Sequence, residues 1–461
     1  MKQVSFFEKW TTVYLVCMAS VCLLYTGASG YLQITAEKSR VYLILSGCYL
    51  MVCVIGRLEL ALLGGRPLPK LPVVWKQLHL MQKLVLGLWL VTAISAVCAV
   101  DRETAFRGGS HREGFWTLSL YYGCFLLVSE LARPKKWMLV VFAAAVSLNC
   151  AVAQLQLAGY NPLELYPLGT NYFDGNRLYL GKFLGTVGSI TLQAALLSLA
   201  VPAFAAALLK GRGNYRFLLL IPLVQCLHLL FQIGISAGYV GVFGGLLLSL
   251  PVLPQTTKNR KRLWIAVALV LLVGLAAVYC WGVFMPDFLP EFSRVLHGEW
   301  DDSFGTNRGY IWRWTLELVP ERLLFGGGPD TIGLRLDKVI SRYRPVFNSS
   351  YTQVLDMAHN EYLNLLVNQG LLALLLYLTL LVAAAGKWLR LASQDTGAAV
   401  CGAAALGYCM QAFFGLSTPF TTCYLWLALA LLVSCIKEND AKTIPKEGLP
   451  REICQSPCAD V

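Results

Sequence analysis

Long apolar runs recur from one end of the chain to the other, and they restrict the possible folds more than any other feature. About twelve of these runs approach the ~20 residues that an α-helix needs to cross a bilayer. Strands of a transmembrane β-barrel would be about ten residues long and would alternate apolar with polar side chains. Only 14% of the residues are charged, against roughly 25% in soluble domains. We therefore predict an all-α polytopic membrane protein.

The positions of the runs predict twelve membrane-spanning helices with both termini in the cytoplasm. The first run lacks a small-residue cleavage site, so it is interpreted as a helix rather than a signal peptide. In this topology residues 1–283 hold nine helices, 284–360 form one large extracytoplasmic loop, 361–436 hold three more helices and 437–461 form a cytoplasmic tail. The predicted spans are residues 10–24, 41–63, 81–100, 115–132, 137–156, 184–209, 216–234, 236–254, 263–283, 361–385, 397–415 and 418–436.

The net charge of +12 is explained by this topology. Lysine and arginine gather in the loops placed in the cytoplasm, which is the positive-inside pattern of membrane proteins. The charge therefore gives no reason to predict nucleic-acid binding. The basic residues of these loops are Arg66, Lys70, Lys76, Arg133, Lys135, Lys136, Lys210, Arg212, Arg216, Lys258, Arg260, Lys261, Arg262, Lys387 and Arg390.

The fifteen cysteines predict neither a disulfide framework nor a metal centre. Most of them lie in apolar runs, where cysteine acts as a small hydrophobic side chain, and the 284–360 loop contains none. Cys454 and Cys458 lack the further ligands that zinc needs. The acids Asp301, Asp302 and Asp330 of the loop show no clear metal-binding spacing. We expect no metal and no other cofactor.

Polar residues in or beside the spans are candidate binding positions, because they are costly in a membrane. Gln225, His228 and Gln232 share one face of the seventh span. They either line a polar groove for a lipid head group or bond neighbouring helices. Arg177 and Lys182 precede a glycine-rich start of the sixth span, where backbone N–H groups suit an anion. Anchoring at the membrane interface is the alternative role for these two residues.

The large loop is too long for a simple connection, since ordinary connections are a few residues long. Residues 307–320 predict an amphipathic surface helix that carries Arg308 and Arg313. FGGGPDTI then predicts a glycine-rich turn, and RLDKVISRYRPVFNSS at 335–350 predicts another helix. His359 lies where the tenth span begins. Because arginine binds phosphate through a planar fork, this basic and aromatic cap suits a lipid-linked phosphate.

The order of Arg308-x3-Trp312, GGGPDT and AHNEYLNLLVNQGLLALLLYL resembles the large external loop of the O-antigen ligase and O-antigen polymerase family. The stretches RLYLGKFLGTVGS and ISAGYVGVFGG are also similar to that family, so the resemblance covers about residues 170–385. One departure is Ala237, which follows Ser236 at a position where many relatives have arginine.

The resemblance implies a metal-independent glycosyltransferase that acts on the outer side of the bacterial cytoplasmic membrane. The donor would be a glycan on undecaprenyl pyrophosphate, and the receiver a hydroxyl of a glycan, lipid, protein or cell wall. By motif, Arg177 and Arg308 would bind the pyrophosphate, and His359 would act in the reaction or, alternatively, cap the tenth span. Further candidate substrate contacts are Arg313, Lys182, Gln225, His228 and Gln232.

The sequence does not decide between a polymerase, which joins lipid-linked repeats, and a ligase, which moves a finished glycan to a different receiver. A transporter or flippase of the same lipid is a rival from another class. It would show inverted repeats, broken helices and charges at the membrane midplane. No clear internal repeat is found in the sequence.

Overall fold

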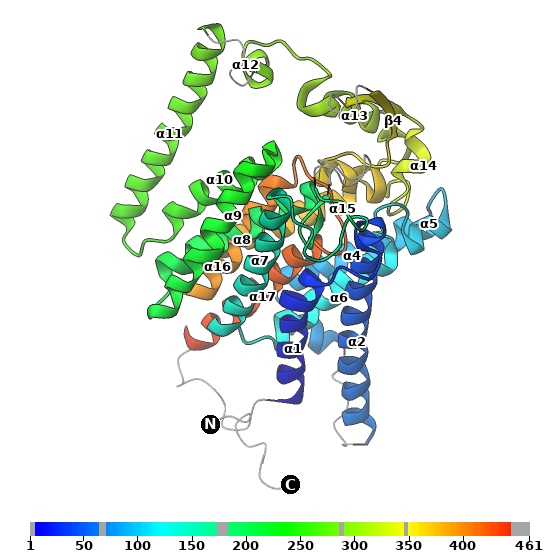
Figure 1. Ribbon diagram of the computed structural model, residues 1–461. Helices are drawn as coiled ribbons and strands as arrows, with labels where there is room; N and C mark the ends of the chain where they lie inside the picture. The colour runs from blue at the N-terminus through cyan, green and yellow to red at the C-terminus, as the bar shows by residue number, and fades with distance from the viewer. Residues whose placement is uncertain (1–4, 64–70, 173–182, 285–289, 345–348, 444–461) are drawn as a thin grey trace.

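Helices occupy every stretch that is predicted to span the membrane. The computed structural model describes residues 5–63, 71–172, 183–284, 290–344 and 349–443. In these ranges the protein is a helical bundle with two antiparallel hairpins, each of two strands (Figure 1). The helices on the predicted spans are α1 (Phe6–Cys17) with its π-helical extension η1 (Met18–Cys22), α2 (Ile34–Leu62), α4 (Leu80–Val97), α6 (Phe115–Leu131), α7 (Lys136–Leu157), α8 (Ile190–Lys210), α9 (Leu220–Ile233), α10 (Ser236–Ser249), α11 (Thr257–Phe284), α15 (Glu361–Leu391), α16 (Thr396–Gln411) and α17 (Thr422–Thr443).

The shorter elements connect or cover these helices. The hairpin of β1 (Phe183–Leu184) and β2 (Gly188–Ser189) occupies the start of the predicted sixth span, so its helix begins at Ile190 rather than at 184. The other short helices are η2 (Gly30–Leu32), α3 (Leu71–Gln77), α5 (Arg102–Arg107), η3 (Asn214–Leu219), η4 (Leu250–Val252), α12 (Pro290–Leu296), α13 (Phe304–Glu317), η5 (Pro320–Arg322) and α14 (Ile332–Leu336).

The helices identify a multi-pass membrane protein. Eight of the described helices are long and apolar enough to cross a membrane, and the shorter apolar helices Phe115–Leu131 and Ser236–Val252 accompany them. Twelve crossings therefore remain a prediction, as does the side of the membrane on which each loop lies.

The centre of the bundle is formed by α8, which packs against α10 and α16 and is buried along most of its length. Small residues allow the three backbones to approach closely, as is common between membrane helices. A Cβ on Gly407 would lie 2.0 Å from the Ser198 carbonyl oxygen, and one on Gly245 would lie 2.8 Å from the Gly407 Cα. The glycine-rich helix α10 is thus packed tightly against α8 and α16.

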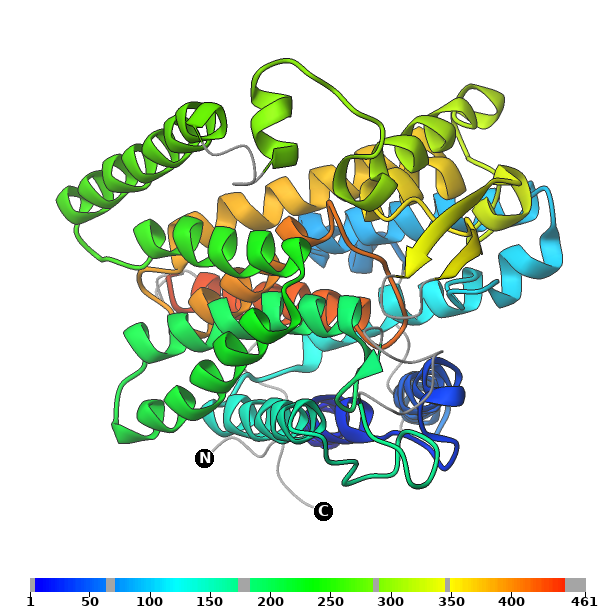
Figure 2. The same cartoon turned by 45° about the horizontal axis from the view of Figure 1, so that its top comes forward.

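Helix α11 stands apart from this centre (Figures 1 and 2). It contacts mainly η4 and α12, and its apolar side chains are largely exposed along the span. An apolar surface of this length suits lipid rather than water. The helix therefore connects the bundle to the long segment between α11 and α15.

This segment, residues 290–358, is the cap of the molecule. Figure 2 shows α13, α14 and a β-hairpin lying over α15. The cap has a small hydrophobic core of its own, in which Ile311, Ile332 and Leu355 pack with Val367 of α15. The helix predicted over 307–320 is present as α13, and the glycine-rich turn follows it.

The helix predicted over 335–350 is wrong. The described residues of this region instead form the antiparallel pair β3 (Val339–Arg344) and β4 (Ser349–Val354), in which Val339 opposes Val354 and Arg344 opposes Ser349. β-Branched and aromatic residues favour strands, and Pro345 disfavours helical geometry at the residue before it. The preference of these residues for a strand explains why the predicted helix does not form.

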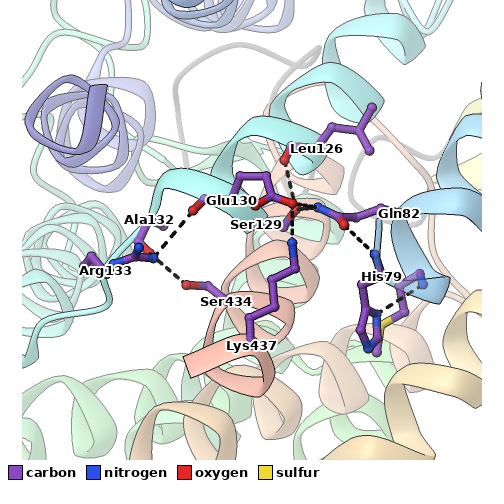
Figure 3. Close-up of polar contacts among 10 residues, drawn as sticks. His79, Gln82, Leu126, Ser129, Glu130, Ala132, Arg133, Ser434 and Lys437 are labelled. Atoms are coloured by element: carbon purple, nitrogen blue, oxygen red, sulfur yellow. Dashed lines mark hydrogen bonds and ion pairs between the residues drawn. The ribbon is translucent and has the colours of Figure 1, made fainter. Parts of the chain in front are cut away.

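The end of the bundle away from the cap is held by a polar cluster that joins α4, α6 and α17 (Figure 3). Gln82 donates to Ser129 Oγ at 2.8 Å and to Glu130 Oε1 at 2.7 Å. Lys437 pairs with the same Glu130 carboxylate, and Ser434 donates to the Ala132 carbonyl at 2.8 Å. The acids and amides of this cluster are matched by partners, so its role is to fix three helix ends.

Candidate functional site

Two of the three predicted catalytic residues, Arg308 and His359, lie in the described part of the chain. Arg308 is bonded to residues 412–421, the loop that connects α16 to α17, and His359 lies two residues before Glu361, whose N–H is bonded to the same loop. Arg308 lies in the first turns of α13, and His359 lies just before α15. Arg177 and Lys182 fall outside the described residues, so their positions remain predictions.

Arg308 reaches the 412–421 loop directly. Its Nη2 donates to the Phe414 carbonyl at 3.0 Å, and its Nη1 donates to the Gly305 carbonyl at 2.6 Å. The guanidinium carbon lies 6.0 Å from the centre of the Phe414 ring, and Trp312 packs on the same ring one helical turn further on. Two carbonyls and an aromatic ring therefore fix the orientation of the Arg308 fork.

His359 lies directly before α15, and the start of this helix is held against the same loop. The side chain of Asn360 caps the helix by accepting a hydrogen bond from the Leu363 N–H at 3.0 Å. The next residue, Glu361, donates its N–H to the Ala412 carbonyl at 2.9 Å. Asn360 thus performs the capping that was the alternative role of His359. The backbone of His359 has a φ of 49°, a conformation that few non-glycine residues adopt.

The remaining predicted contacts lie elsewhere. Arg313 pairs with Asp302 and lies 5.5 Å from the centre of the Tyr310 ring. Ser147 of α7 donates to Gln225 at 2.5 Å, and His228 lies within hydrogen-bonding distance of Gln154 on α7 and of Gln232. Of the two roles weighed for the α9 stripe, bonding to a neighbouring helix is the one these contacts favour.

A polar cavity of about 70 Å³ lies beside the same loop. It is bounded by the residues before α6, the first turns of α15 and the start of α17. Most of its polar lining consists of carboxyl, amide and hydroxyl groups, and its apolar wall is aromatic. The lining residues are Leu88, Glu113, Leu118, Tyr121, Tyr122, Asp330, Glu361, Asn364, Leu365, Asn368, Gln369, Tyr377, Ser417, Thr422 and Trp426.

Glu113 and Glu361 are the two most enclosed acids of the cavity, with exposed fractions of 8% and 9%. Each carboxylate is held by a tyrosine: Tyr121 donates to Glu113 Oε1 at 2.7 Å, and Tyr408 donates to Glu361 Oε1 at 2.8 Å. Burial raises the pKa of Glu113 to about 7, because a low-polarity environment disfavours the charged form. Glu113 can therefore exchange a proton near neutral pH.

Asp330 connects the cavity to the glycine-rich turn. Its Oδ2 accepts hydrogen bonds from the N–H groups of Gly109 and Glu113, at 2.6 and 3.2 Å. Burial raises the pKa of Asp330. The turn and the loop before α6 are thus joined through one carboxylate.

An ion pair between His111 and Asp356 lies close to this junction. His111 Nε2 lies 3.3 Å from Asp356 Oδ2, just before the start of α15. Burial opposes the charged forms of both groups, but their contact and mutual attraction raise the pKa of His111 and lower that of Asp356 to about 2. The pair attaches the cap to the loop before α6.

The glycine-rich turn fills a break in α15. At Gly370 the helix is interrupted, with φ 86° and ψ 177°. The carbonyls freed by the break accept from the turn: Gly327 N–H binds the Val367 oxygen at 3.0 Å, and Gly328 N–H binds the Asn368 oxygen at 2.8 Å. Non-helical backbone is tolerated at membrane depth only where other groups satisfy it. The carbonyl groups freed by the break in α15 therefore need the glycine-rich turn as their hydrogen-bond donor.

Sequence reasoning missed the carboxylate cavity. Glu361 was considered only as a helix cap, Asp330 only as a metal ligand, and Glu113 not at all. The cavity is assembled from segments more than 200 residues apart in the chain, and no local spacing reveals it. A usable signal was the position of Glu113, an acid immediately before an apolar span, where a charge is costly unless it has a partner or a function. Among the described residues, no group of three or more histidine, cysteine or acidic side chains is arranged to hold a metal.

Comparison with known protein families finds a match to part of the chain. Residues 221–378 match the model of the O-antigen ligase family, a range that runs from α9 into α15 and includes Arg308, the glycine-rich turn and His359. No curated protein matches the chain. Over residues 221–378, on which the motifs noted in the sequence also lie, the chain is similar to the O-antigen ligase family.

Proposed function

We propose that this protein transfers a glycan from undecaprenyl pyrophosphate to a hydroxyl group, with inversion at the anomeric carbon and without a metal. The reaction takes place on the outer side of the bacterial cytoplasmic membrane. The observation that carries the proposal is that the 412–421 loop holds both Arg308 and the start of α15, directly after His359, and that Arg308 and His359 lie inside the matched family range.

The main contribution of the protein to this reaction is electrostatic stabilisation of the leaving group. Pyrophosphate is a good leaving group, so the barrier falls mainly through cations that stabilise the charge developing on it, an effect of about 3–4 kcal/mol per donor. Arg308, with its fork held by the Phe414 and Gly305 carbonyls, is such a donor. Arg177 is proposed to be the second. His359 then orients the receiving hydroxyl or takes its proton.

The decisive experiment uses a strain that lacks the gene and is complemented with variants at verified membrane levels. His359→Ala and Arg308→Lys should each abolish most of the transfer of lipid-linked glycan; the lysine keeps the charge and removes the fork. Matched controls in the same cap are His297→Ala and Arg294→Lys. Normal glycan assembly with either His359→Ala or Arg308→Lys would contradict the proposed role of that residue.

The same strain separates the two kinds of transfer. Accumulation of single lipid-linked repeats indicates a polymerase, whereas accumulation of long lipid-linked chains indicates a ligase. Mass spectrometry of the extracted lipid-linked glycans measures which of the two accumulates.

A transporter of the same lipid is the second candidate, because α15 is a broken helix, a common feature of transporters. The break is occupied by the backbone of the cap itself, which favours a fixed structural joint. If the protein were a transporter, lipid-linked glycan would remain on the cytoplasmic face in the deletion strain. A lectin added outside spheroplasts would then fail to bind it.

A further inference from the structure

Donors and the cavity meet the 412–421 loop at different residues. The donors lie at Phe414: the Arg308 guanidinium on its carbonyl, and the buried Trp312 Nε1 near its ring, which has no hydrogen-bond partner among the described residues. The cavity meets the loop at Ser417, and its polar wall is rich in oxygen atoms. Transfer from a pyrophosphate to a hydroxyl requires this division, because the leaving group gains negative charge while the nucleophile gives up a proton.

Two buried oxygen atoms of the cavity lack a hydrogen-bond donor in the described part of the chain. Asn368 is 3% exposed, and its Oδ1 has no hydrogen-bond partner in the described part of the chain. The buried Oδ1 of Asn364, one turn earlier on α15, is in the same condition. A buried acceptor without a partner is costly, so these two amides indicate an occupant that donates hydrogen bonds.

The size of the cavity is sufficient for such an occupant. A volume of about 70 Å³ holds several water molecules at roughly 10–15 Å³ each. It therefore has room for a hydroxyl group of a larger molecule together with water.

We propose that this cavity receives the nucleophilic hydroxyl and that Glu113 and Glu361 together accept its proton. The proposal rests on the proposed glycan transfer, and it assigns the removal of the proton to the carboxyl pair rather than to His359. Tyr408 holds Oε1 of Glu361, which leaves Oε2 for the hydroxyl or for a bridging water.

The step balances without a further reactant. The O–H bond of the receiving hydroxyl breaks, and its oxygen forms the new bond to the anomeric carbon. The bond from that carbon to the pyrophosphate oxygen breaks, and its electron pair leaves with the phosphate beside Arg308. The proton moves to the carboxyl pair and later returns to water.

The surroundings of the pair suit proton exchange. Glu113 and Glu361 interact electrostatically with each other, and Asp330 and His111 also face Glu113. The Glu113 pKa of about 7 is close to the value that favours general base catalysis at neutral pH. The other titratable groups that face the two carboxyls are Tyr121, Tyr122, Tyr362, Tyr377, Tyr408 and Cys409.

The first test measures transfer in isolated membranes of the deletion strain, which hold the donor and the receiving molecule, after expression of each variant. Glu361→Gln and Glu113→Gln should each lower the initial rate by about a hundredfold or more. The wild-type rate should fall as the pH drops from about 8 to 5, and the double variant should lose this dependence. Glu103→Gln, in the exposed α5 helix, is the matched control. Each variant is accepted only if its melting temperature equals that of the wild type.

The second test needs no transfer. Infrared titration of the purified full-length protein in nanodiscs detects the C=O stretch of protonated carboxyls. The wild type and Glu103→Gln should show a carboxyl band that titrates near neutral pH and that Glu113→Gln/Glu361→Gln lacks. Absence of transfer by the wild type would refute the proposed glycan transfer. Transfer by the wild type, with the rate or the pH profile unchanged in both single variants, would overturn the carboxyl pair alone.

Discussion

Gly370→Ala should detach the glycine-rich turn from α15 without unfolding the bundle. The combination of φ 86° and ψ 177° at this residue is accessible essentially only to glycine. A Cβ there would lie 2.2 Å from the Leu324 carbonyl oxygen and 2.5 Å from the Phe325 nitrogen. Both contacts are to backbone atoms, so no side-chain rotation relieves them and the turn has to move away.

The magnitude follows from the bonds at the break. Backbone strain costs about 1–3 kcal/mol. The turn is attached through Gly327 to Val367, Gly328 to Asn368 and Leu371 to Leu323, at 3.0, 2.8 and 2.8 Å, and each bond contributes about 1 kcal/mol. These bonds, about 3 kcal/mol together, favour the docked turn in both proteins, whereas only the variant carries the strain and the overlap of its Cβ with backbone atoms, which adds about 1–3 kcal/mol. The substitution therefore disfavours the docked turn by about 4 kcal/mol, roughly a thousandfold in the docking equilibrium.

Limited trypsin digestion in membranes detects the detachment at Arg335. In the native protein this side chain is 7% exposed and donates to the carbonyls of Val367 and Leu318 at 3.0 and 3.1 Å. Cleavage after Arg335 should be slow in the wild type and fast in Gly370→Ala. The matched control is Gly386→Ala in the same helix, where a Cβ meets nothing within 4 Å.

The reasoning would be refuted if Gly370→Ala protected Arg335 as well as the wild type does. It would also fail if Gly386→Ala were cleaved equally fast, because general weakening of α15 would then explain the result. Glycan transfer should fall with the cleavage, since α13 and the turn belong to the same cap.

Two further predictions concern the ion pairs. His111 has a raised pKa in the folded protein. Its pairing with Asp356 therefore stabilises the cap fully below the unfolded pKa near 6.5, and this stabilisation is lost as the pH rises through the folded pKa. Over that rise in pH, cleavage at Arg335 should accelerate in the wild type but not in His111→Gln. Glu130→Gln alters the polar cluster that joins α4, α6 and α17 (Figure 3). It should lower the free energy of unfolding by about 1 kcal/mol or less, because the Glu130 carboxylate is partly exposed. Glycan transfer should stay unchanged, and a large loss of transfer would contradict a purely structural role for the cluster.

Local patterns in the sequence determined most of the fold. Apolar runs of bilayer length predicted the helices, because the bilayer leaves the backbone no other partners than its own. The helix over 307–320 and the glycine-rich turn also followed from residues close together in the chain. The helix predicted over 335–350 is wrong, because Val339, Ile340 and Tyr343 favour a strand and pair with β4.

By itself, then, the sequence determined the class of protein, the order of its helices and the resemblance that pointed to Arg308 and His359. Only the tertiary structure decided what these residues meet. The 412–421 loop joins Arg308 to the start of α15, and the cavity brings Glu113 to within electrostatic reach of Glu361. The physical reason is that helix formation depends on near neighbours, whereas a site depends on contacts between segments whose separation in the chain carries no periodic signal.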